Sequence, residues 1–220
     1  MIRAVVFDLD GTLLRQGIDF AALRREIGAP PASDIIRFLD SLPPRARTAA
    51  ERTVEEHERR AAEGSELNDG ARELLEFLRS EGIPSAVNTR NSRLCLDMAI
   101  RRHGLAFDAS VSREDAPPKP APESVLRIAE CLGLPPESLL VVGDFAFDTE
   151  SARRAGALAV YLSDGKPPLV PTRTHFVVEK LGDLVPLIRR LRAGDAAPGE
   201  PVALEPRRVA APRPWKNPPS

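Results

Sequence analysis

The chain has 220 residues, of which 42% are hydrophobic and 29% are charged, and 31 Lys and Arg against 32 Asp and Glu give a net charge of −1. These values are typical of a globular protein with one domain and a small insert. The balanced charge argues against nucleic-acid or membrane binding driven by bulk electrostatics.

No signal peptide or membrane-spanning segment is predicted, because Asp8 and Asp10 interrupt the apolar amino-terminal run after a few residues. The two cysteines, Cys95 and Cys131, lie in apolar helical patterns. We expect both to be buried free thiols, since two cysteines make neither a disulfide framework nor a paired zinc motif. A reducing, cytoplasmic location is therefore predicted.

Short apolar runs alternate with amphipathic stretches through most of the chain. The runs that predict strands are 2–9, 84–89, 138–143, 157–162 and 174–179, with a shorter one at 108–111. The stretches that predict helices are 69–81, 91–103, 121–132, 147–155 and 181–192. This alternation predicts an α/β fold with a doubly wound, mostly parallel, Rossmann-like sheet.

Two segments depart from the alternation. Residues 15–67 contain no strand pattern, but helical patterns near 18–28, 33–42 and 45–62 that are separated by proline pairs. They predict a small α-helical cap inserted after the first strand, which leaves 1–14 and 68–193 as the core domain.

Residues 194–220 are rich in proline and arginine and have no apolar periodicity, so a disordered tail is predicted. A solvated tail is the simpler interpretation. The cations around Trp215 are also a candidate docking segment for a protein partner: Arg207, Arg208, Arg213 and Lys216.

Four polar segments follow predicted strands, at the edge of an open parallel sheet where ligands bind. In the first, Asp8 and Asp10 precede Gly11, which permits a sharp turn and brings two carboxylates to one centre. Like charges at that distance repel unless a cation neutralises them. A polar strand end that feeds a turn is the alternative.

The second and third segments each supply one residue. Thr89 ends the second main strand beside a helix start, where a hydroxyl binds an anion. A helix N-cap at Thr89, Asn91 or Ser92 is the alternative. Lys119 is one of only four lysines and lies between prolines in a rigid loop, although an exposed loop lysine is equally consistent with this position.

The fourth segment places Asp144 and Asp148 after Gly143, at a strand end and a helix start. Carboxylate oxygens are the ligands that Mg²⁺ prefers, together with water and substrate phosphate. Asp148 is also a candidate N-cap of the helix 147–155, a role compatible with a place at the metal site.

In this order, the four segments resemble the motifs of the haloacid dehalogenase-like (HAD) hydrolase superfamily. DLDGT at 8–12, Thr89, Lys119 and GDxxxD at 143–148 match its four motifs, and the resemblance covers residues 1 to about 192. The helical insert and the string 88–91 resemble the phosphoglycolate phosphatase-like branch. Phe145 departs from the small or polar residue of many members but leaves both carboxylates in place.

The resemblance implies a Mg²⁺-dependent phosphoric monoester hydrolase that forms an aspartyl-phosphate on Asp8. Asp10 would protonate the leaving oxygen and then activate water. Asp8, Asp144 and the backbone carbonyl of Asp10 would hold Mg²⁺, and Asp148 would orient a metal-bound water or Asp144.

The same resemblance assigns substrate binding to Thr89 and Lys119, which would hold the phosphoryl oxygens. The partner expected is a small phosphorylated metabolite, with no nucleic acid and no membrane. Phe20, Arg24 and Arg47 are candidate cap residues facing the site, although a solvated helix face is the simpler place for each.

Several functions stay open at this point. Asp10 favours phosphate ester hydrolysis over dehalogenation, because family dehalogenases lack this residue. A sugar-phosphate mutase of the same superfamily uses the same four segments. A non-catalytic interaction protein that keeps the fold is a third reading, although all six site residues are intact in the sequence.

Overall fold

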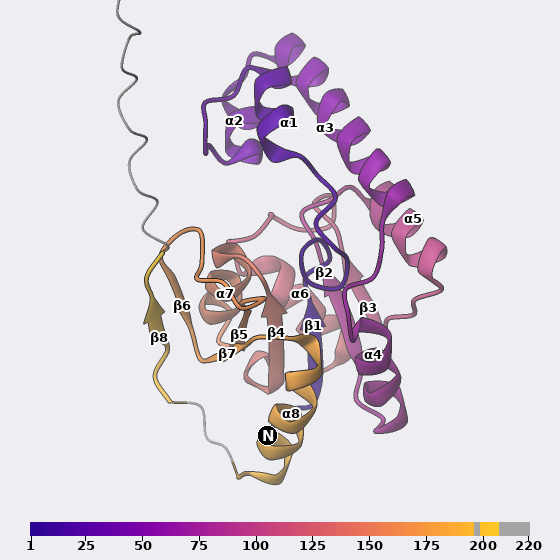
Figure 1. Cartoon of the computed structure of the whole chain (residues 1–220), viewed down its shortest axis with the longest axis vertical. Helices are drawn as coiled ribbons and strands as arrows, with labels where there is room; N and C mark the ends of the chain where they lie inside the picture. The colour runs from indigo at the N-terminus through magenta and orange to yellow at the C-terminus, as the bar shows by residue number, and fades with distance from the viewer. Residues whose placement is uncertain (196–198, 207–220) are drawn as a thin grey trace, which may run out of the picture.

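The computed structural model describes residues 1–195 and 199–206, and a six-stranded parallel sheet forms its centre (Figure 1). The strand order is β3–β2–β1–β4–β5–β7. The strands are β1 Ala4–Phe7, β2 Ser85–Asn88, β3 Ala109–Val111, β4 Leu139–Gly143, β5 Leu158–Leu162 and β7 Phe176–Val178. The predicted α/β class and parallel sheet are confirmed.

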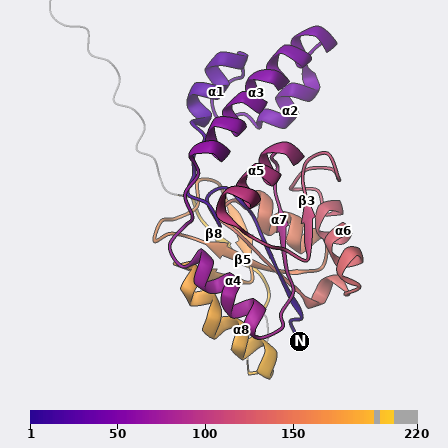
Figure 2. The same cartoon turned by 90° about the vertical axis from the view of Figure 1, so that its right-hand side faces the viewer.

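Helices cover both faces of this sheet, as the view turned by 90° shows (Figure 2). One face packs against α4 Ala71–Ser80, α5 Arg93–His103 and α8 Leu184–Ala193. The other packs against α6 Glu123–Leu132 and α7 Ala146–Arg154. Single turns of 3₁₀ helix at Pro136–Ser138 and Leu181–Asp183 precede β4 and α8.

The central strands are apolar on both sides because both faces are covered. In β1, Val5 and Phe7 enter the core under α4, α5 and α8, whereas Ala4 and Val6 enter the core under α6 and α7. β1 pairs with β2 on one side and with β4 on the other. The order of the strands reverses at β1 and β4, and this switch point is where open α/β sheets bind ligands.

The segment 15–67 folds as three helices above the carboxyl edge of the sheet (Figures 1 and 2). They are α1 Phe20–Ile27, α2 Ile35–Ser41 and α3 Pro44–Gly64. The side chains of Asp19 and Asp34 accept backbone N–H groups and so cap α1 and α2. These helices share an apolar cluster of their own, made of Ile18, Leu23, Leu39, Ala50 and Val54.

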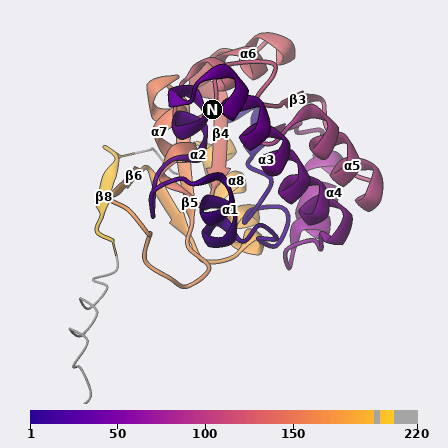
Figure 3. The same ribbon diagram turned by 90° about the horizontal axis from the view of Figure 1, so that it is seen from above.

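Two features differ from the sequence-based expectations. Thr172–Thr174 (β6) pairs antiparallel with Val202–Leu204 (β8), so the prediction of disorder from residue 194 onward is wrong for 202–204 (Figure 3). Prolines at 201 and 206 bound β8, and a sequence pattern does not reveal a partner strand so far back in the chain. The other tail residues, 196–198 and 207–220, lie outside the described residues, including Trp215 and the four cations around it.

Both cysteines are free thiols, as expected, and Cys95 is buried. Cys131 is exposed on α6, so the expectation that both thiols are buried is wrong for Cys131. Within the described part of the chain, no helix is both long and apolar enough to cross a bilayer.

Candidate active site at the carboxyl edge of the sheet

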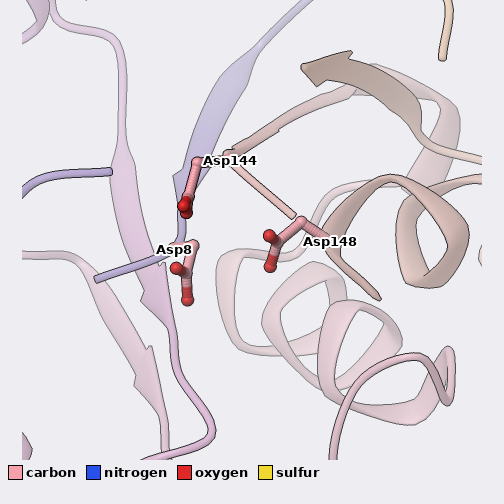
Figure 4. A group of neighbouring side chains, drawn as sticks. All are labelled: Asp8, Asp144 and Asp148. Atoms are coloured by element: carbon pink, nitrogen blue, oxygen red, sulfur yellow. The ribbon is translucent and has the colours of Figure 1, made fainter. Parts of the chain in front are cut away.

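Three carboxylates meet where β1 and β4 end. Asp8 follows β1, Asp144 follows β4, and Asp148 lies in the first turn of α7. One oxygen of each lies within 4.8 Å of the others, and Asp148 turns toward the other two (Figure 4). Because β1 and β4 are adjacent parallel strands, their ends place Asp8 and Asp144 side by side.

Lys119 is the cation of this cluster. Its side chain is only 3% exposed, and its Nζ lies 2.5 Å from Asp8 Oδ1 and 2.5 Å from Asp148 Oδ1. It also donates to the backbone carbonyl of Asn88 at the end of β2 (2.8 Å). Lys119 is therefore a buried site residue that joins three elements, and the alternative of an exposed loop lysine is wrong.

Asp148 is fixed from both sides. Oδ1 contacts Lys119, and Oδ2 accepts the backbone N–H of Phe145 at 3.1 Å. Asp148 is the third residue of α7 and caps the helix from within, so it is not the N-cap residue itself. The Phe145 ring packs edge-on against Phe147, with ring centroids 4.8 Å apart.

The turn after β1 supports Asp144. Gly11 has a φ of +86°, and a Cβ there would lie 2.3 Å from Asp144 Oδ2, so both the conformation and the close approach require glycine. Thr12 Oγ1 donates to Asp144 Oδ1 at 3.1 Å. Asn68 Nδ2 donates to the carbonyls of Gly11 (3.1 Å) and Thr12 (2.7 Å), which holds the turn in place.

Asp10 has a different environment from Asp8. Its side chain is not part of the three-carboxylate group, and its Oδ2 accepts from Asn91 Nδ2 at 2.5 Å. Thr89 is buried one residue beyond β2, where its Oγ1 accepts the backbone N–H of Asn91 at 3.1 Å. The N-cap of α5 is Ser92, which leaves Thr89 out of the capping role.

Burial raises the pKa values of Asp8, Asp10 and Asp144. Burial raises the pKa of Asp8 well above its ordinary value, with Lys119 opposing the rise and Asp148 and Asp144 adding to it. Burial and the charge of Asp148 raise the pKa of Asp144 to about 7. Burial also raises the pKa of Asp10, against the hydrogen bond from Asn91.

This donor set fits a divalent cation. Within the described residues, the buried carboxylate of Asp148 and the half-buried carboxylates of Asp8 and Asp144 lie around one ammonium group, so the charged forms are not fully compensated. Carboxylates that converge in this way supply the hard oxygen ligands that Mg²⁺ prefers, and the cation would favour their charged forms. Asp8 and Asp144 have oxygens for it, while both oxygens of Asp148 already have protein donors.

Comparison with known proteins shows the family of the chain. A family model described as haloacid dehalogenase-like hydrolase matches residues 2–156. This chain belongs to that family. The predicted family and the prediction of a hydrolase are thereby confirmed.

The hydrolase also has relatives along most of its length. It is 33% identical over 201 residues to the uncharacterized hydrolase YOR131C of Saccharomyces cerevisiae, and this match covers 86% of this chain and 92% of the yeast protein. It is 28% identical over 218 residues to a phosphoglycolate phosphatase of Chromobacterium violaceum, covering 86% and 97%. A predicted phosphoglycolate phosphatase from Haemophilus somnus shares the fold, with a TM-score of 0.68, 22% identity, and coverage of 85% and 98%.

Two of the three candidate cap residues, Arg24 and Arg47, make their polar contacts inside the insert of this hydrolase. Arg24 donates to the carbonyls of Ser33 and Phe20 and lies over the Phe20 ring, and Arg47 pairs with Asp40 and Glu51. These contacts are all internal to the insert. A cavity of about 450 Å³ between α4 and the start of β2 lies at the opposite edge of the sheet, and none of the predicted site residues line it.

Sequence reasoning missed Thr12 and Asn68 as supports of Asp144, and treated Asn91 only as a candidate cap. The GT of the first motif pointed to Thr12. Nothing in the sequence around Asn68 indicated that it bonds to a turn more than 50 residues earlier.

Opposite stability effects are expected from neutralising two neighbouring carboxylates. At about pH 8 in metal-free buffer, Asp144 is ionised in the folded and unfolded states, and the ionised form is disfavoured by burial. Asp144→Asn should therefore raise the free energy of unfolding by about 1–3 kcal/mol.

Asp148→Asn is the matched control. This substitution removes the negative charge that pairs with the buried Lys119, and it should lower the free energy of unfolding by about 2–4 kcal/mol. Urea unfolding of both variants in EDTA measures the difference. Destabilisation by Asp144→Asn equal to that of Asp148→Asn would contradict the described charge balance.

Proposed function

We propose that this hydrolase is a Mg²⁺-dependent phosphatase that cleaves a small phosphate monoester through an aspartyl-phosphate on Asp8. The observation that carries the proposal is the contrast between Asp8 and Asp10. Asp8 lies against Lys119 and the other two carboxylates, whereas Asp10 bonds to Asn91 outside that group. Two carboxyl groups in unlike environments suit two different roles.

In the first step, an Asp8 oxygen attacks phosphorus and the bond from phosphorus to the leaving oxygen breaks. Asp10 protonates that oxygen, a role that its raised pKa favours. In the second step, Asp10 takes a proton from water, the water oxygen attacks phosphorus, and the Asp8 carboxylate is released.

The remaining groups stabilise charge on the transferred phosphoryl group. Lys119 is in contact with Asp8, and Thr89 follows the strand whose last carbonyl accepts from Lys119. We assign both to the phosphoryl oxygens. Mg²⁺, held by Asp8, Asp144 and the backbone carbonyl of Asp10, supplies charge stabilisation when bound. Asp148 orients Lys119 and the metal site.

The three-helix insert is proposed as the cap of this site, and the substrate as a small phosphorylated metabolite. The reported relatives include a phosphoglycolate phosphatase, which supports this class of substrate. A cytoplasmic location is part of the same proposal, and the free thiols support it.

Hydrolysis of p-nitrophenyl phosphate tests the chemistry. Turnover should require Mg²⁺, and Asp8→Asn should lower it by about a thousandfold or more without loss of secondary structure by circular dichroism. Turnover that is insensitive to EDTA, or turnover by Asp8→Asn close to that of the parent protein, would contradict the proposal. With a sugar phosphate, released inorganic phosphate identifies a hydrolase and an isomerised product identifies a mutase.

The role of Asp10 depends on the leaving group. Asp10→Asn should slow an alkyl phosphate by about 10²–10⁴-fold, because an alkoxide needs a proton to depart. p-Nitrophenolate needs far less help, so the same variant should lose much less activity with that ester. Equal losses with both esters, measured as kcat, would argue against Asp10 as the acid.

A further inference from the structure

The insert is attached to the core unevenly. The carboxyl-terminal half of α3 is tied down by Glu58, which is only 5% exposed, pairs with Arg113, and accepts the backbone N–H of Ser92. Beyond α3, Ser65 bonds to His103 of α5 at 2.8 Å. This end of the insert is therefore fixed on the core.

The α1–α2 part, residues 18–43, packs against α3 and is joined to the core by one polar contact. Arg90 Nη2 lies 2.7 Å from Asp34 Oδ1, with side-chain exposures of 23% and 13%. Among residues 1–195 and 199–206, no other hydrogen bond or ion pair joins 18–43 to the core. The apolar cluster of this part is internal to the insert.

On the core side, the guanidinium group of Arg90 also packs against an aromatic ring. Its guanidinium carbon lies 4.4 Å from the centroid of the Phe147 ring, within the range of a cation–π contact. Its Nε is buried and has no hydrogen-bond partner among the described residues. Phe147 directly precedes Asp148, and Arg90 directly follows Thr89. On the core side, the Asp34–Arg90 pair is therefore connected to residues that are next in sequence to Thr89 and Asp148, two of the proposed site residues.

We propose that Asp34, Arg90 and Phe147 form a latch that holds the α1–α2 part of the insert closed against the site. When the latch breaks, this part moves together with the amino-terminal half of α3, against which it packs, while the carboxyl-terminal half stays fixed on the core. When the latch forms, it fixes the loop that carries Thr89. Arg90 is thus a positioning residue. The expected effect of the latch on KM rests on the proposed phosphatase function. Its expected effect on the position of the insert does not.

Distance measurement between spin labels tests the latch without any substrate. One label is attached to Cys131, which is exposed on α6, and the other to Arg37→Cys at an exposed position of α2. Cys95 is buried and is not a labelling position. Asp34→Asn removes the charge but keeps a residue that caps helices equally well. Arg90→Gln removes the other partner.

Asp19→Asn is the matched control, because Asp19 caps α1 in the same way but, within the part of the chain that the structure describes, forms no hydrogen bond or ion pair with the core. A single narrow distance distribution is expected in the parent and in Asp19→Asn. A broader distribution that extends to longer distances is expected in Asp34→Asn and Arg90→Gln. Distributions unchanged from the parent in both latch variants would overturn the proposal.

Kinetics separate the latch from a merely structural role. Both latch variants should raise KM for p-nitrophenyl phosphate by about threefold to tenfold, with the melting temperature close to that of Asp19→Asn. An unchanged KM with a broadened distance distribution would overturn the link to the site. Loss of all turnover in the parent protein would count against the phosphatase proposal, and the distance result would stand on its own.

Discussion

Asp148, which is buried, and Asp8 and Asp144, which are half-buried, lie around the ammonium group of Lys119, and this concentration of charge is the constraint on which the site depends. Charges removed from water are costly unless they are paired and hydrogen-bonded. Lys119 neutralises part of this cluster, and backbone and hydroxyl donors satisfy individual oxygens. The charge that stays uncompensated is the physical reason why this carboxylate group is suited to hold a divalent cation, and it lowers the stability of the fold when no cation is bound.

Much of the fold and the site could be predicted because both follow from periodic patterns. Apolar runs buried on both faces predict parallel strands, and the strands end at a common edge. Polar residues directly after such runs must therefore meet, as Asp8 and Asp144 do. Lys119 had no such pattern, and only its order among the four motifs distinguished it from an ordinary loop lysine.

The rest depends on contacts between residues far apart in sequence, which no local pattern reveals. β8 gains its structure only by pairing with β6. Cys131 lies on an amphipathic helix whose buried side the pattern did not place correctly, so its exposure was mispredicted. Asn68 and Asp34 resemble ordinary turn and cap residues, yet each reaches a second segment: Asn68 holds the turn after β1, and Asp34 pairs with Arg90.

The stereochemical course at phosphorus tests the proposed two-step transfer through Asp8 most directly, because each in-line displacement inverts the configuration once. A phosphorothioate ester made chiral with oxygen isotopes is hydrolysed in water that carries a third isotope, and the configuration of the released thiophosphate is determined. Overall retention is expected from two displacements. Inversion would show direct attack by water and would contradict the role of Asp8 as the nucleophile.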